Sequence, residues 1–240
     1  MIDWIEPVWS APRCVRAVST LRTGGVSGGD YASLNLGHHV GDDGECVREN
    51  RRRLQQGLSL PAEPIWLRQV HGIRVIDAAA ADDRTADAAF ARQPRLVCAV
   101  LTADCLPILL CSVDGECVAA VHAGWRGLAT GVVEAAVEAL GTRNLLAWLG
   151  PAIGSDAFEV GGDVREIFLR QNEAFASSFR TAGSGKWFAD IYSIARLQLA
   201  QLGITECSGE DLCTHSDAER FFSYRRDGQT GRMATLIWRE

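Results

Sequence analysis

Three side chains with metal-binding chemistry stand where a predicted apolar strand gives way to a loop. They are His71, Cys105 and His122, and each is followed within two residues by glycine or proline. The end of a strand holds a side chain rigidly, whereas the loop that follows leaves open space beside it. This placement is typical of a reactive site.

Imidazole nitrogen and thiolate sulfur are the protein ligands that Zn²⁺ prefers, and three of them leave one tetrahedral position for water or substrate. The three residues are separated by 34 and 17 positions, which is too far for a local zinc knuckle. The fold must therefore bring them together. We predict a catalytic zinc rather than a structural one, because no fourth ligand stands at short spacing.

The same residues leave three alternatives open. In a metal-free cysteine hydrolase or amidase, such as one that edits peptidoglycan precursors, Cys105 would be the nucleophile and His122 the base, with Asp104 or Asn35 orienting it. A non-enzymatic scaffold with a structural zinc is the second alternative. A single-copper polyphenol oxidase is the third, because such a site binds Cu²⁺ at least as tightly as Zn²⁺.

Hydrophobic periodicity predicts a mixed set of elements. The predicted helices are 45–56, 131–140, 164–179 and 191–202. The predicted strands are 65–70 with 74–76, 96–101, 106–111, 116–121, 145–149, 221–224 and 233–238. Asp114-Gly115 is a tight-turn signal that predicts a hairpin. No linker interrupts the sequence, and we expect a single α/β domain over residues 1–240 with mixed β-sheets.

Composition excludes several classes of protein. The formal net charge is −6, which argues against a nucleic-acid polymer as partner. The most apolar region, 96–113, contains Asp104 and Pro107, which predicts core strands and not a membrane span. The eight cysteines include no Cys-x-x-Cys pair, and the N-terminus lacks the pattern of a secretory signal. We expect a cytoplasmic protein with reduced thiols; no motif predicts its oligomeric state.

Several segments together resemble the laccase-domain family, also called polyphenol-oxidase-like or YfiH-like. The matching segments are Arg22–Ser27, Ser33–Gly37 with Val40–Asp43, Gln69–Gly72, Thr102–Pro107, His122–Gly127, Leu149–Gly154, Phe158–Gly161 and Phe221–Arg226. They span nearly the whole chain in the order of the family. One departure is Thr20–Thr23, where the family often has Thr-Thr-Arg or Ser-Thr-Arg before Gly-Gly-Val-Ser.

The resemblance implies a layered domain in which helices flank mixed sheets, and it implies His71, Cys105 and His122 as zinc ligands. It also implies phosphorolysis of adenosine, inosine, guanosine and methylthioadenosine, and deamination of adenosine, with purine nucleosides and phosphate as small-molecule partners. Four-copper laccase chemistry is excluded, because it requires about ten histidines and the chain has five.

For these reactions, four further residues are candidates by chemical type. Asp104, beside Cys105, is a candidate acid/base for deamination. Arg22 and Arg225 are candidates for binding phosphate, because a guanidinium pairs with two oxygens at once. Asn35 could hydrogen-bond the base or the ribose.

Overall fold

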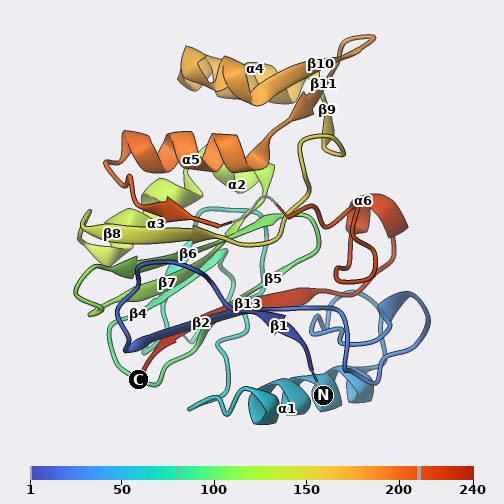
Figure 1. The fold of residues 1–240 in the computed structure, drawn as a ribbon, viewed down its shortest axis with the longest axis vertical. Coiled ribbons are helices and arrows are strands. Elements are labelled where there is room, and N and C mark those ends of the chain that lie inside the picture. Colours follow the sequence, from blue (N-terminus) through green and yellow to red (C-terminus); the bar gives the residue numbers. More distant parts are fainter. Residues whose placement is uncertain (1, 81, 210–211) are drawn as a thin grey trace.

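Two stacked β-sheets lie between helices in the computed structural model, which describes residues 2–80, 82–209 and 212–240. From one side to the other, the layers are helix α1 (Gly44–Gly57), a four-stranded sheet, a six-stranded sheet, and helices α2 (Trp125–Thr130), α3 (Val132–Leu140) and α5 (Ile191–Gln201) (Figure 1). The prediction of a layered α/β fold with mixed sheets is confirmed.

The strand order joins distant parts of the chain. The four-stranded sheet is β1 (Trp4–Ile5), β2 (Val15–Thr20), β13 (Met233–Arg239) and β5 (Cys98–Thr102). The six-stranded sheet is β12 (Cys207–Ser208), β8 (Leu145–Leu149), β6 (Leu106–Ser112), β7 (Val118–Ala123), β4 (Ala88–Ala91) and β3 (Val75–Asp77). A small third sheet is β10 (Phe179–Gly183), β11 (Lys186–Ala189) and β9 (Glu159–Gly161).

Strands of the six-stranded sheet are apolar on both faces because both faces are covered. On β6, Leu106, Ile108 and Leu110 belong to the core under the helices. The alternate residues Leu109 and Cys111 belong to the core between the two sheets. Side chains alternate along a strand, and the continuous apolar run in the sequence therefore follows from burial on two sides.

The helices begin and end where the sequence supplies caps. The Asp43 carboxylate accepts the amides of Glu45 and Cys46 at the start of α1, as expected of an N-cap. Helix α3 ends at Gly141, whose φ of 66° is readily adopted only by glycine. The remaining helices are α4 (Gly162–Gln171), α6 (Tyr224–Asp227) and the 3₁₀ segments Gly29–Tyr31 and Glu173–Ser178.

Three predicted elements are wrong. Residues 65–70 form no strand; Ile65 and Arg68 make only isolated bridges. The helix predicted over 164–179 ends at 171, because Asn172 is extended and its side chain caps the following 3₁₀ turn. Residues 221–224 are not a strand, since the Ser223 hydroxyl caps α6 by accepting the amide of Arg226.

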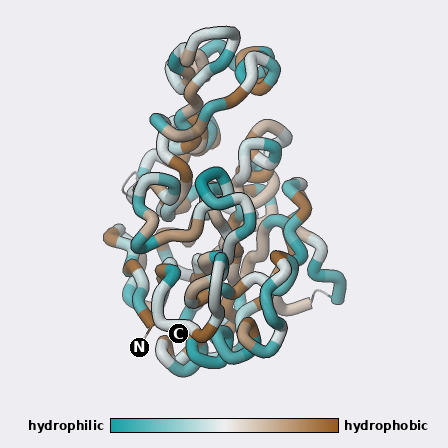
Figure 2. Tube along the Cα trace, turned by 90° about the vertical axis from the view of Figure 1, so that its right-hand side faces the viewer, coloured by the Kyte–Doolittle hydropathy of each residue, from teal (hydrophilic) through white to brown (hydrophobic). Residues whose placement is uncertain are grey.

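Helix α4 and the strands β9 to β11 form a lobe at one end of the molecule, which stands at the top of both views (Figures 1 and 2). None of the described helices is both long enough and apolar enough to cross a membrane.

Candidate metal centre and its cavity

The structure brings the three predicted metal ligands together. The ligand atoms of His71, Cys105 and His122 all lie within 4.8 Å of one another. Cys105 Sγ is 3.8 Å from His71 Nε2, and the two imidazole rings meet edge to face with centroids 4.8 Å apart. His122 is buried, Cys105 is partly buried and His71 is exposed, so that the cluster opens to one side.

Strand register explains why residues so far apart in sequence meet. Strands β6 and β7 form the hairpin predicted at Asp114-Gly115, and Leu106 pairs with Ala123 in it. Continuing that register, Cys105 lies opposite Gly124, beside the end of β7 that carries His122. The turn before Cys105 connects β5 of the four-stranded sheet to β6 of the six-stranded sheet. The thiol therefore lies where these two strands meet, at the end of both sheets.

A buried carboxylate, which the sequence analysis missed, organises the cluster. Asp87 is fully buried, and its Oδ1 lies 2.8 Å from His122 Nδ1. The same carboxylate accepts the backbone amides of Val70, His71 and Gly72 at 3.2, 2.8 and 2.7 Å. One side chain therefore fixes both histidines. The signal in the sequence was a lone acid at the start of the apolar run Ala88–Ala91.

The segment before His71 is held by side chains instead of a strand ladder. The Gln69 amide donates to the Leu101 carbonyl and accepts the Leu101 amide, both at 2.8 Å. His71 itself has a φ of 60°, which is uncommon for a residue other than glycine. The bonds to Asp87 on either side of His71 hold this conformation.

Cys105 and His122 shift each other's pKa. Burial alone would raise the pKa of the Cys105 thiol, but His122 and His71 outweigh it and lower this pKa to about 6. Burial alone would lower the pKa of His122, but Cys105 and Asp87 outweigh it and raise this pKa to about 9. Each of the two groups therefore favours the charged form of the other.

The donor set fits a tetrahedral transition metal. Because Asp87 engages Nδ1 of His122, its Nε2 is left for a metal, as in carboxylate–histidine–zinc arrangements. Sulfur and nitrogen ligands at about 2.3 and 2.0 Å from one tetrahedral ion lie about 3.5 Å apart, close to the 3.8 Å found here. No second cluster of three such ligands occurs among the described residues.

A cavity of about 400 Å³ opens over the cluster. Its lining is His39, Gln69, His71, Leu101, Thr102, Ala103, Cys105, His122, Tyr224 and Arg232. This size falls within the range of small-molecule sites, about 300–1,000 Å³. Arg232 is the arginine of this lining, and the sequence analysis missed it because nothing in its spacing marks it.

The four residues proposed for substrate handling do not line this cavity. Asp104, beside Cys105, accepts the Thr214 hydroxyl and the Arg225 amide, each at 2.6 Å. Asn35 is fully buried, and its carboxamide binds Gly37, Asp42 and the Arg232 amide.

The guanidinium groups of Arg22 and Arg225 donate to backbone carbonyls. Arg22 donates to the carbonyls of Ala32 and Ala218. Arg225 donates to the carbonyls of Ala157 and Glu159. The substrate-binding roles of both arginines stay predictions, and the structure gives their side chains protein partners.

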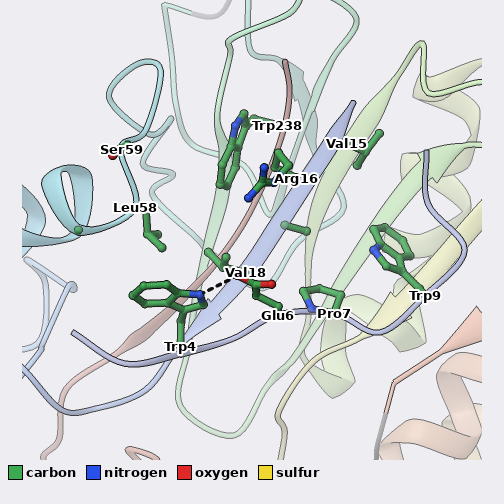
Figure 3. Close-up of a pocket in the computed structure, with 12 residues that line it drawn as sticks. Trp4, Glu6, Pro7, Trp9, Val15, Arg16, Val18, Leu58, Ser59 and Trp238 are labelled. Atoms are coloured by element: carbon green, nitrogen blue, oxygen red, sulfur yellow. Dashed lines mark hydrogen bonds between the residues drawn. The ribbon is translucent and has the colours of Figure 1, made fainter. Parts of the chain in front are cut away.

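A smaller cavity, of about 240 Å³, lies beside β2 (Figure 3). Trp4 and Trp238 border it, and the Trp4 indole donates to Glu6 at 3.3 Å. Its lining holds no histidine or cysteine, and it therefore lacks the donor set found at the metal centre.

Fold and site together define a layered α/β protein with a candidate mononuclear His₂Cys metal centre. The chain belongs to the family described as multi-copper polyphenol oxidoreductase laccase, whose model matches residues 16–240. It is 50% identical to proteins called purine nucleoside phosphorylase from Pseudomonas aeruginosa and Escherichia coli, over 99% of both chains in each case.

Solved structures agree with this assignment. A Neisseria meningitidis protein is 47% identical over 99% of both chains, with a TM-score of 0.95. YlmD from Geobacillus stearothermophilus is 31% identical with a TM-score of 0.85, covering 95% of this chain and 93% of its own. The family resemblance predicted from sequence is confirmed.

Gly124 leaves room for the ligands, which gives a first testable prediction. A Cβ at this position would stand 3.0 Å from Cys105 Sγ and 3.1 Å from His71 Cδ2, although its φ of −69° suits alanine. We expect Gly124→Ala to weaken zinc binding about tenfold, the lower end of what disturbed ligand orientation costs. Chelator competition measures the affinity. The control is Gly28→Ala, since Gly28 has no atom near its Cβ position; equal zinc affinity in both variants would contradict the prediction.

Proposed function

We propose that the protein is a zinc-dependent purine nucleoside phosphorylase that also deaminates adenosine. The observation that carries the proposal is the cluster of two imidazoles and one thiolate at the floor of a cavity, with its open side toward the cavity. The names of the relatives from Pseudomonas aeruginosa and Escherichia coli support the phosphorylase part. Copper could replace zinc on the same donors.

The chain positions the reacting groups through fixed side chains. His71, Cys105 and His122 would hold the metal, which supplies Lewis acidity to the cavity when bound. Asp87 orients His122 and the His71 backbone. The hydrogen bonds of Asp104 to Thr214 and Arg225 favour a positioning role for this carboxylate, which ties the turn before Cys105 to α6.

The test compares metal content with product formation. We expect about one zinc per chain by plasma mass spectrometry. With adenosine, phosphate should be required for release of adenine, whereas inosine should form without phosphate. Chelation should abolish both reactions and added zinc should restore them. An active protein without metal would overturn the zinc assignment, and phosphate-independent adenine release would overturn phosphorolysis.

A metal-free cysteine hydrolase is the second candidate, favoured by one observation. Cys105, His122 and Asp87 are arranged as nucleophile, base and orienting acid, and the pKa of Cys105 is lowered to about 6 although burial opposes this. This candidate predicts turnover of an amide substrate that survives chelation. The zinc enzyme loses all turnover under the same treatment.

A further inference from the structure

We infer that Arg232, assisted by His39, forms the phosphate-binding subsite of the cavity. The inference rests on the proposed phosphorolysis and identifies the residues that would hold its second substrate. Both residues line the cavity together with His71, Cys105 and His122. The arginines proposed from sequence, Arg22 and Arg225, do not.

Arg232 is held in place by the protein. Its Nη1 donates to the carbonyls of Thr230 and Gly231 at 2.9 and 3.0 Å, and its backbone amide donates to Asn35 Oδ1 at 2.9 Å. Its stem packs on Gly37, where an added Cβ would come within 2.9 Å of Cγ. An oriented guanidinium loses little conformational freedom when it binds an oxyanion.

Its remaining donors have no acceptor among the described residues. Among the hydrogen bonds and ion pairs of residues 2–80, 82–209 and 212–240, none involves Nε or Nη2 of Arg232. A partly buried cation without a carboxylate partner is unfavourable unless a ligand supplies the negative charge. Two free guanidinium donors match two oxygens of one phosphate.

The charge of Arg232 acts on His39, which lines the same cavity. Burial lowers the pKa of Arg232, and the negative groups Cys105 and Asp104 raise it in part. Burial lowers the pKa of His39 first, and Arg232, Arg51 and His122 lower it further. An anion bound beside His39 would favour its charged form, which could then donate to that anion.

The reaction defines what the subsite must do. An oxygen of HPO₄²⁻ forms a bond to C1′ of the nucleoside, and the C1′–N9 bond breaks with its electron pair going to the purine. The proton of the phosphate passes to the purine, which leaves ribose 1-phosphate and free base. Arg232 would hold two of the phosphate oxygens that do not attack and keep the attacking oxygen directed at C1′.

The test replaces Arg232 by glutamine, which keeps the stem on Gly37 and removes the charge. We expect Arg232→Gln to raise the phosphate KM of phosphorolysis about 10- to 100-fold, the range for lost hydrogen bonds to a charged group. The KM for adenosine in phosphate-independent deamination should rise much less than the phosphate KM, because deamination does not use phosphate. Arg232→Lys should lie between, because it keeps the charge and loses the fork. The matched control is Arg16→Gln, which removes an exposed arginine paired with Glu240.

Titration of inorganic phosphate into the zinc-loaded protein separates this inference from the proposed function. If the wild type binds phosphate and Arg232→Gln does not, the subsite stands even when no phosphorolysis is found. If both bind phosphate equally, or both show equal phosphate KM, the subsite assignment is overturned while phosphorolysis stands. Should Arg232→Gln fail to fold, Arg232→Lys decides by the same two measurements.

Discussion

Replacing Cys105 by alanine should remove the proposed zinc and lower the proposed turnover of adenosine by at least about 10³-fold. Its thiolate is one of three candidate ligands that the described residues bring together, and the remaining histidines would hold the ion weakly. A Lewis acid contributes several kcal/mol to such reactions, and each 1.36 kcal/mol is tenfold in rate. Metal analysis and steady-state kinetics on the same preparations measure both effects.

A matched control separates the role of Cys105 from that of a thiol in general. Cys46 is also partly exposed but lies on α1, outside the lining of the cavity. We expect Cys46→Ala to keep zinc and full activity. Zinc should also protect Cys105 from alkylation by iodoacetamide. If Cys105→Ala loses activity while it keeps stoichiometric zinc, Cys105 is a nucleophile and not a ligand.

The candidate ligands could be singled out from sequence because each lies next to an apolar run that local patterns reveal. The strand bounds differ from those predicted, since His122 lies within β7 and Cys105 directly precedes β6. The hairpin at Asp114-Gly115 was also predictable, and with it the approach of Cys105 to His122. The position of His71 was predicted for the wrong reason, because residues 65–70 form no strand and are held by Gln69 and Asp87.

Residues that act through long-range contacts could not be found in this way. Arg232 meets the cavity because β13 pairs with β5, a contact between residues at least 131 positions apart that no periodicity encodes. Conversely, Arg22, Asn35 and Arg225 have the right chemistry and lie in motifs of the family. Asn35 is used by the Gly37 amide of its own loop, whereas Arg22 and Arg225 donate to the distant carbonyls of Ala218 and Glu159. Local sequence does not distinguish such contacts from ligand binding.

Replacing Asp87 by asparagine should weaken zinc binding about 10- to 100-fold, the usual cost of losing a carboxylate that orients a metal-bound histidine. Asp87 is fully buried and accepts hydrogen bonds from His122 and three backbone amides. Asparagine offers one oxygen, and its NH₂ would face donors. We therefore also expect the free energy of unfolding to fall by about 3 kcal/mol.

The control for this prediction is Asp77→Asn, because Asp77 lies on β3, parallel to the strand that follows Asp87. Among the described residues, its carboxylate accepts one hydrogen bond, from the Ala79 amide. It should change zinc affinity by less than about twofold, in keeping with a partly exposed position.

Nitrogen NMR of the histidines measures which ring nitrogen carries the proton, and a loss of stability alone does not change this result. In the wild type with zinc, His122 should carry its proton on Nδ1, because Asp87 accepts it there. If Asp87→Asn lowers stability but leaves both zinc affinity and this proton unchanged, Asp87 supports the fold only, and the orientation of His122 comes from its place on β7.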